Sequence, residues 1–484
     1  MSIITQINLL KKRRTKIIAT LGPASSEPEQ IRDLIKTGVN VFRQNMSHGD
    51  HSYHKETYAR IRDIASELNQ PVGILADLCG PKIRTGKFRN GCIEIRNNDT
   101  VIVTTRDVEG EPGLIPSQFS ALADDVAQGD RILLADGTLE LEVNTVDGTE
   151  ITCTVIYGGT IGNHKGINLP GVNVSAPSLT EKDKADTKLA LELGVDFLAL
   201  SFVRSASDIL DLRELIASHN SNVQIIAKIE KPEALDDANA ILDAADGIMI
   251  ARGDLGVELH PEQVPVAQHQ LIDLARQKFK PVIVATQMLE SMIENARPTR
   301  AEVTDVAYAV TLGTDAIMLS GETAIGTFPI DTVKMMDRIA RQTESYLWTH
   351  NTYGTKNTDS TSMTAMPIWD AMANSMAQLA QDLKVHAVVV ISQSGMSAAT
   401  MSSARPAAPV IAITNSPKIC RKMAILWGVI PVLSEDAGEF NPNELARKVV
   451  VDEGLALAGD KVLLIRGFHS ETELNTPSVT VVTI

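Results

Sequence analysis

Eight short apolar segments along the chain each end at a polar or charged residue. They are rich in Val, Ile and Leu without strict alternation, which is typical of parallel strands buried on both faces. They span residues 16–20, 40–45, 72–77, 196–201, 223–230, 247–254, 281–286 and 315–320. The pattern predicts a parallel sheet covered by helices.

The spacing of all but one of these segments suits a strand, a helix and two loops. Two capping boxes are predicted at helix starts. One is Ser26 with Glu29, with Pro28 in the first turn, and the other is Thr299 with Glu302. Glycines end helices shortly before the next strand, at Gly38, Gly194 and Gly313. Eight such units favour an α/β fold built on a closed (β/α)₈ TIM barrel, although an open doubly wound sheet has similar local signals.

The long step between the third and fourth segments predicts an inserted all-β barrel domain. Short strands are expected at 101–103, 132–134, 139–143 and 151–155, with hairpin turns at Asp136-Gly137 and Asp147-Gly148. Because the insertion follows a strand, it should hang from the C-terminal rim of the barrel, where it can close over a site.

The last part of the chain predicts a separate α/β domain. A Ser/Thr/Asn-rich linker is expected at 349–362, then a helix at 368–383 and strands at 387–391, 410–413, 429–432, 461–465 and 479–484. The predicted boundaries are therefore 1–76 and 174–343 for the barrel, 77–173 for the insertion and 344–484 for the C-terminal domain.

Composition narrows the possible partners. The 484 residues are 44% apolar and carry a net charge of -15, so neither nucleic acid nor an anionic membrane is an expected partner. After the basic residues Lys11 to Arg14, no apolar stretch follows that is long enough for a signal peptide or a membrane span. The four cysteines form neither a CxxC pair nor a disulfide-dense pattern, which indicates a reducing compartment, the cytoplasm.

The residues at the C-terminal rim of a (β/α)₈ barrel should converge on one active site. Here the cationic ones are Arg43, Arg84, Lys228 and Lys165, the anionic ones are Glu230 and Asp254, and the small polar ones are Asn45, Ser47, Ser201, Thr286 and Ser320.

Glu230 and Asp254 come from neighbouring segments and suit Mg²⁺ or Mn²⁺ better than zinc. The alternative is that they merely pair with Lys228 and Arg252. Lys228 lies two residues before Glu230, so both side chains point to the same face of a strand. A cation beside a metal site is useful when an anionic substrate lies between them, which indicates phosphoryl or enolate chemistry.

One loop of the C-terminal domain is a second candidate site. It joins a predicted strand to a helix and carries Ser392, Ser394, Gly395 and Ser397. Hydroxyls and backbone N–H groups at a helix N-terminus suit a phosphate, while an ordinary N-cap and turn would have the same composition. No P-loop or GxGxxG motif follows any predicted strand.

Several segments closely resemble those of the pyruvate kinases, in order along the chain from about residue 14 to its end. They are residues 17–25, 42–49, 80–84, 228–231, 251–256, 285–292 and 318–323. The resemblance implies a cytoplasmic, glycolytic phosphotransferase that converts phosphoenolpyruvate and ADP into pyruvate and ATP through a Mg²⁺-stabilised enolpyruvate. It also implies an allosteric homotetramer.

The resemblance also implies roles for individual residues. Glu230 and Asp254 would hold Mg²⁺, Lys228 would neutralise the phosphoryl group and the enolate, Arg43 would grip the phosphate, and Thr286 would help to protonate the enolate carbon. The other implied residues are Gly253, Ser201 and Ser320 for the substrate, and Pro23, Asn45, His48, Tyr53, Arg84 and Lys165 for the nucleotide, with which a second Mg²⁺ would arrive.

One position departs from many members of that family. Where they have Gly-Pro-Glu and require K⁺, this chain has Gly80-Pro81-Lys82. The family's K⁺ position matches Asn45, Ser47, Asp77 and the main chain at Leu78. Because an ammonium group can supply the single charge of the ion, Lys82 is expected to replace K⁺, which should not be required.

By resemblance, the loop from Ser392 to Ser397 is an effector loop for a sugar phosphate or nucleotide. The segment after Gly467 is short and lacks a second basic cluster, which favours a monophosphate sugar or AMP over a bisphosphate. Two other functions are less favoured. A Mg²⁺-dependent barrel lyase or aldolase would not need the nucleotide residues Pro23, His48 and Tyr53 or the inserted β domain, and a metabolite sensor with an inactive barrel would have lost some of the polar residues at the strand ends.

Overall fold

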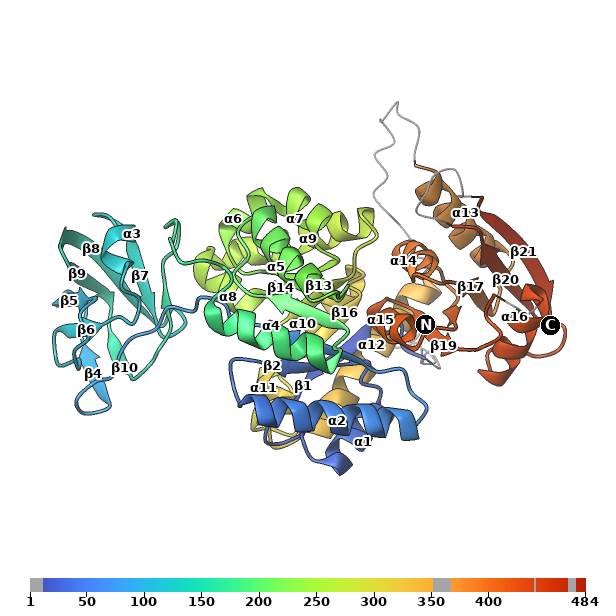
Figure 1. Ribbon diagram of the computed structural model, residues 1–484, viewed down its shortest axis with the longest axis horizontal. Helices are drawn as coiled ribbons and strands as arrows, with labels where there is room; N and C mark the ends of the chain where they lie inside the picture. The colour runs from blue at the N-terminus through green and yellow to red at the C-terminus, as the bar shows by residue number, and fades with distance from the viewer. Residues whose placement is uncertain (1–11, 351–366, 439–440, 469–475) are drawn as a thin grey trace, which may run out of the picture.

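Three folded parts lie in a row along the molecule, with the inserted domain at one end, the barrel in the middle and the C-terminal domain at the other end (Figure 1). The computed structural model describes residues 12–350, 367–438, 441–468 and 476–484. Within these ranges, no helix has both the length and the apolar character needed to span a bilayer. Beyond residue 350, the predicted linker lies outside the described residues.

The predicted closed barrel is confirmed. Its parallel strands pair in the order β1-β16-β15-β14-β13-β12-β3-β2, and β2 closes the ring onto β1. The strands are β1 (Lys16–Thr20), β2 (Val41–Asn45), β3 (Gly73–Asp77), β12 (Phe197–Leu200), β13 (Gln224–Ile229), β14 (Gly247–Ala251), β15 (Val282–Ala285) and β16 (Ala316–Leu319). Closure of the ring excludes the open doubly wound sheet.

Helices cover the outside of the barrel and bury its apolar side chains. They are α1 (Pro28–Thr37), α2 (His51–Glu67), α4 (Glu181–Leu193), α5 (Ala206–Ser218), α6 (Pro232–Asp236), α7 (Ala238–Ala244), α8 (Arg252–Glu258), η1 (Pro261–Gln263), α9 (Val264–Gln277), η2 (Glu290–Ile293), α10 (Arg300–Thr311), α11 (Gly321–Ala324) and α12 (Pro329–Thr349). The helix α12 continues past residue 343, so the predicted boundary between 343 and 344 falls inside a barrel helix and is wrong.

The helix signals were largely right. Thr299 and Glu302 form the predicted capping box, and Gly38 and Gly194 end their helices in the left-handed conformation. The box predicted at Ser26 is wrong, because Glu27 is the N-cap of α1 and Pro28 is its first residue. A residue before proline is driven to extended backbone, which fixes the start of this helix one position later.

The inserted domain contains two sheets. A six-stranded sheet has the order β11-β7-β8-β9-β5-β6, and β10 pairs with β4. The elements are β4 (Cys92–Ile95), β5 (Thr100–Thr104), β6 (Leu114–Pro116), α3 (Leu122–Asp125), β7 (Arg131–Leu134), β8 (Leu139–Asp147), β9 (Glu150–Tyr157), β10 (Gly159–Gly162) and β11 (Ile167–Asn168).

The predicted β-barrel is therefore only partly right. The entering segment lies between the two outer edges of the larger sheet, where Arg84 bridges to Gly166 and Thr85 to Ser117. The segment that leads from β3 into the inserted domain therefore closes the ring through isolated bridges, and not through a continuous ladder of strand pairs. Asp77, assigned to the insertion from sequence, is the last residue of the barrel strand β3.

The C-terminal domain is a five-stranded sheet with the order β19-β18-β17-β20-β21, in which β21 is antiparallel. Its elements are α13 (Ile368–Asp382), β17 (Ala387–Ile391), α14 (Met396–Ser403), β18 (Val410–Thr414), α15 (Pro417–Lys422), η3 (Met423–Ile425), β19 (Val429–Leu433), α16 (Pro442–Asp452), β20 (Lys461–Arg466) and β21 (Ser478–Thr483). Ile18 and Ile226 inside the barrel share one apolar cluster with Val388 and Ala398 of this domain.

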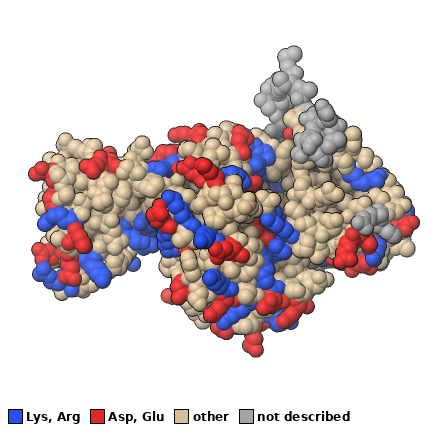
Figure 2. Space-filling view, in the orientation of Figure 1, with Lys and Arg blue, Asp and Glu red and all other residues tan. Residues whose placement is uncertain are grey.

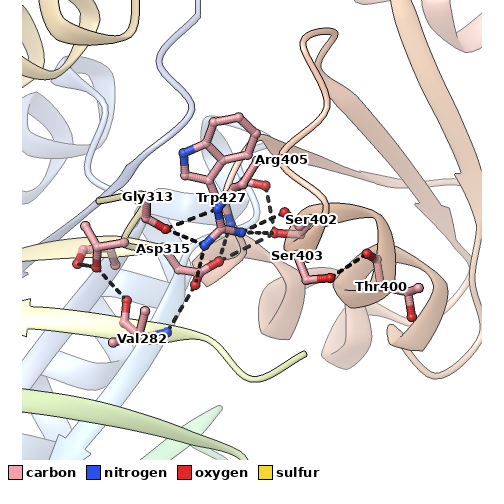
Figure 3. Close-up of polar contacts among 10 residues, drawn as sticks. Val282, Gly313, Asp315, Thr400, Ser402, Ser403, Arg405 and Trp427 are labelled. Carbon is pink, nitrogen blue, oxygen red and sulfur yellow. Dashed lines mark hydrogen bonds and ion pairs between the residues drawn. The ribbon is translucent and has the colours of Figure 1, made fainter. Parts of the chain in front are cut away.

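A buried ion pair joins the barrel to the C-terminal domain (Figure 3). The Arg405 guanidinium lies 2.9 Å from Asp315 Oδ2 and donates twice to the carbonyl of Gly313, at 3.1 and 2.6 Å. Asp315 also accepts the backbone N–H of Trp427, at 3.0 Å. Both charged side chains are 4% exposed, so neither charge is satisfied by water.

Arg405→Ala should weaken this junction by roughly 3–5 kcal/mol, because Asp315 would stay buried without its cation. In differential scanning calorimetry we expect the melting temperature to fall by roughly 5–10 °C. The control is Lys334→Ala, which removes an exposed pair with Asp331 and should cost about 0–1 kcal/mol. Identical melting curves for the two variants would contradict the assignment.

Candidate active site

The C-terminal rim of the barrel faces the inserted domain across a cleft of about 620 Å³. Lys82 and Asp136 line one part of it, and Gly253, Asp254 and Gln287 line another. Basic side chains gather in the hollow where the inserted domain meets the barrel (Figure 2). The size is within the range of small-molecule sites, and the local positive charge offsets the acidic total.

The buried carboxylate of Asp77 connects two of the predicted cations. The Nε of Arg43 donates to Asp77 Oδ2 at 2.6 Å, and the Nζ of Lys228 lies 3.3 Å from Asp77 Oδ1. Burial alone would raise the pKa of Asp77, but the charges of Lys228 and Arg43 outweigh it and hold this pKa below its usual value. Asp77 therefore stays ionised and keeps both cations at the rim.

Lys228 and Glu230 point to the same face, as predicted. The Lys228 Nζ lies 3.0 Å from Glu230 Oε1 and donates to the Ser201 hydroxyl at 2.6 Å. Burial by itself would lower the pKa of Lys228, but Asp77 and Glu230 raise it above its ordinary value. Lys228 is therefore a permanent cation at neutral pH.

Glu230 lies one residue beyond the end of β13, and 1% of it is exposed. Its Oε2 accepts the backbone N–H of Phe202 at 2.6 Å. Burial raises the pKa of Glu230, Lys228 lowers it, and the negative charge of Asp254 raises it further. The two carboxylates thus repel each other, which a divalent cation between them would relieve.

Asp254 was predicted at the end of a strand, and this is wrong. The strand β14 stops at Ala251, and Asp254 lies in the first turn of α8. A carboxylate there is favoured by the partial positive charge of the helix N-terminus. The turn still directs Asp254 into the cleft.

Thr286 has an unusual backbone conformation. Its φ is +68°, which is rare for a β-branched residue. The Thr286 hydroxyl accepts the N–H of Gly253 at 2.7 Å, and its carbonyl accepts from Arg252 at 2.8 Å. These bonds hold Thr286 against the first turn of α8, beside Asp254.

The alternative pairing of the two carboxylates is half right. Glu230 does pair with Lys228, but Arg252 lies 2.7 Å from Asp305, and Asp254 pairs with Lys82, whose Nζ is 3.6 Å from Asp254 Oδ1.

Lys82, the expected replacement for K⁺, forms its ion pair with Asp254 rather than with Asp77. Its second contact is with Asp136, at 3.9 Å, while Arg43 and Lys228 contact Asp77. Of the other residues at the expected K⁺ position, Asn45 accepts the N–H of Ser47 at 3.1 Å, and the Leu78 carbonyl accepts from Ser201 at 2.7 Å.

The remaining predicted residues lie around this centre. Ser320 follows β16 and donates its N–H to Glu322 at 2.7 Å. Arg84 and Lys165 are carried by the inserted domain, where Arg84 donates to the carbonyl of His164 at 3.0 Å. Pro23, His48 and Tyr53 lie in the β1–α1 loop, in the β2–α2 loop and in the first turn of α2. Among the described residues, the polar partners of Lys228 are Ser201, Asp77 and Glu230, and none of them is a nucleotide candidate.

Sequence reasoning missed three residues that hold the site together: Asp77 as the partner of two cations, Arg252 as the support of Thr286, and Glu322 as the buried acceptor for Ser320. Asp77 could have been found, because it ends the third apolar segment. Arg252 and Glu322 lie inside the segments 251–256 and 318–323 described above. Sequence alone does not show which residues of the neighbouring segments they contact.

The chemistry of the donor set fits a divalent cation. Glu230 and Asp254 supply hard oxygen ligands that repel each other across the site. In the described part of the chain, no cluster of three or more His, Cys, Asp or Glu side chains is arranged to hold a metal. A site with two protein carboxylates suits Mg²⁺ or Mn²⁺, which share their remaining positions with water and substrate.

A closed (β/α)₈ barrel with two carboxylates and a ring of cations at its C-terminal rim defines an enzyme for an anionic substrate. Residues 12–333 match the family described as pyruvate kinase, barrel domain, and residues 370–482 match the family described as pyruvate kinase, alpha/beta domain. The chain belongs to the pyruvate kinase family and is a phosphotransferase.

Individual relatives agree with this assignment. Pyruvate kinase 2 of Synechocystis sp. is 45% identical over 460 residues, which cover 94% of this chain and 76% of the relative. Pyruvate kinase of Geobacillus stearothermophilus is 44% identical over 463 residues, covering 94% and 78%. The crystal structure of a pyruvate kinase from Cryptosporidium parvum superposes with a TM-score of 0.89 at 36% identity and covers 98% of each chain.

Proposed function

We propose that this chain transfers the phosphoryl group of phosphoenolpyruvate to ADP, giving pyruvate and ATP, at the rim around Lys228. The observation that carries the proposal is the buried network in which Asp77 and Glu230 hold Lys228 while Asp77 holds Arg43. It presents two fixed cations to an anionic substrate without the mutual repulsion that would otherwise separate them.

In the transfer, the bond between phosphorus and the enol oxygen breaks, and its electron pair stays on that oxygen. A terminal oxygen of ADP forms the new bond to phosphorus. Lys228 faces the charge that develops on both groups, and Arg43 holds the phosphate from the opposite side of Asp77. Because these cations are already in place, stabilising the transition state requires little reorganisation.

A divalent cation held by Glu230 and Asp254 would neutralise negative charge on the substrate. Ser201 orients the Lys228 ammonium through its hydroxyl, and Gly253 lets the chain approach Thr286 closely. Thr286 would then place a water that delivers a proton to the enolate carbon, which completes pyruvate. For ADP we propose Pro23, Asn45, His48, Tyr53, Arg84 and Lys165, with Ser320 lining the substrate pocket.

Lys228→Met should lower kcat by at least about 10²–10³-fold, because a preorganised cation is lost from the transition state. The measurement is pyruvate formation from phosphoenolpyruvate and ADP with Mg²⁺, coupled to lactate dehydrogenase. Lys184→Met is the control, since Lys184 pairs with Glu181 on the exposed side of α4. Wild-type rates from Lys228→Met, or no pyruvate from the wild-type chain, would refute the proposal.

We also propose that the enzyme works without K⁺. The ammonium of Lys82 lies 3.6 Å from Asp254, so the site already contains a fixed monovalent charge close to the candidate metal ligands. Wild-type rates should be the same in KCl and in tetramethylammonium chloride. Lys82→Glu should create a requirement for K⁺, and a several-fold stimulation of the wild type by K⁺ would contradict the idea.

For the loop from Ser392 to Ser397, we propose binding of a phosphorylated effector, a monophosphate sugar or AMP. The Ser392 hydroxyl accepts the N–H of Gly395 at 3.0 Å, which shapes the turn before α14. Residues 469–475, in the segment after Gly467, lie outside the described residues. Activation at subsaturating phosphoenolpyruvate tests the proposal, and a flat response to every sugar monophosphate and to AMP would reduce the loop to an ordinary cap.

Family membership supports a homotetramer. Size-exclusion chromatography with light scattering would test this by measuring the molar mass, which should be four times that of one chain. Cys79, Cys92, Cys153 and Cys420 are free thiols, which supports a reducing compartment, the cytoplasm. Fractionation of cells that make the protein would test this placement.

A further inference from the structure

A buried carboxylate that the proposed reaction does not use joins three segments around the cleft. Glu258, the last residue of α8, accepts from the Lys231 ammonium at 2.7 Å and from the Asn168 amide at 3.0 Å, both through Oε1. Its side chain is 1% exposed. Its other oxygen, Oε2, is buried and has no hydrogen-bond partner in the described part of the chain.

The partners of Glu258 come from elements that carry or face the candidate metal site. Lys231 directly follows Glu230 in the chain, and Glu258 lies on α8 four residues after Asp254. One ion pair therefore links the segments that carry the two carboxylates. Both segments follow strands, β13 and β14, that pair with each other in the barrel. Beyond the ends of these strands, the bond between Lys231 and Glu258 restricts how far apart Glu230 and Asp254 can lie.

The third partner belongs to the inserted domain. Asn168 is in β11, opposite Leu133 of β7, so its bond to Glu258 crosses between the inserted domain and the barrel. A second contact lies nearby, because a Cβ at Gly137, in the β7–β8 turn, would come within 3.4 Å of Val257 on α8. In this turn Ala135 and Asp136 have positive φ, a conformation that side-chain-bearing residues rarely adopt.

We propose that Glu258 is a positioning residue through which the docked inserted domain holds Glu230 and Asp254 at the separation a divalent cation needs. The inference rests on the assignment of these two carboxylates as metal ligands made above. Glu258 itself does not touch the metal or the substrate. Its role resembles that of outer-shell partners, whose loss weakens metal binding although the ligands remain.

The experiment measures Mn²⁺ affinity by electron paramagnetic resonance of the free ion, on the full chain without substrate. Asn168→Ala cuts only the connection to the inserted domain, and Glu258→Gln removes the charge at the centre. Both variants should bind Mn²⁺ about 10-fold or more weakly, and the Mn²⁺ concentration that half-activates pyruvate formation should rise by the same factor.

The matched control is Asn144→Ala, which removes an amide bonded to Thr154 inside the inserted domain and should leave Mn²⁺ affinity unchanged. Glu230→Gln tests the metal assignment separately from the positioning role of Glu258. If Glu230→Gln keeps the wild-type affinity, the metal assignment is wrong and the inference is overturned with it.

If Glu230→Gln loses Mn²⁺ while Asn168→Ala and Glu258→Gln bind it as the wild type does, the metal site is right and the positioning role is overturned. A lower melting temperature with unchanged Mn²⁺ affinity would likewise assign Glu258 to stability alone. Should Glu258→Gln fail to fold, Asn168→Ala decides the question, because it leaves the buried ion pair with Lys231 intact.

Discussion

The site depends on one buried carboxylate, Asp77, which binds two cations at once. Arg43 and Lys228 would repel each other at the narrow rim if water were excluded, and a substrate anion alone would have to overcome that repulsion on arrival. Asp77 compensates both charges before any ligand is present. The same arrangement explains why the pKa of Lys228 lies above its ordinary value although the side chain is largely buried. A strongly acidic protein can therefore keep a local site for an anion.

Barrel closure makes that compensation possible, since it brings the ends of β2, β3 and β13 to one rim. This much was predictable from sequence, because parallel strands buried on both faces leave a clear apolar pattern and their polar ends must meet. The side chains of Lys228 and Glu230 followed from the alternation of a strand. The position of Asp254 did not, since α8 begins directly after the last residue of β14 and without a capping side chain to mark its start.

The contacts between folded parts were beyond sequence reasoning for a different reason. Asp315 and Arg405 are 90 residues apart, and Asp196 and Arg421 are 225 apart. Asn168 and Glu258 are likewise far apart, at 90 residues. Each of these side chains looks like an ordinary surface charge or amide until the fold buries it. Local periodicity carries no information on such partners, whereas the capping box at Thr299 lies within four residues and was readable.

Asp196 and Asp315 stand at the first residues of the apolar segments before β12 and β16, at the barrel end opposite the active site. Arg405 of the C-terminal domain neutralises Asp315, and Arg421 shares Asp196 with Arg62 of the barrel helix α2. Apolar side chains inside the barrel continue into the core of the C-terminal domain. The barrel is thus not a self-sufficient module. Replacement of the C-terminal domain by one without an arginine at this place would leave the buried carboxylate of Asp315 without its cation, so a substitute domain has to match the barrel in charge as well as in shape.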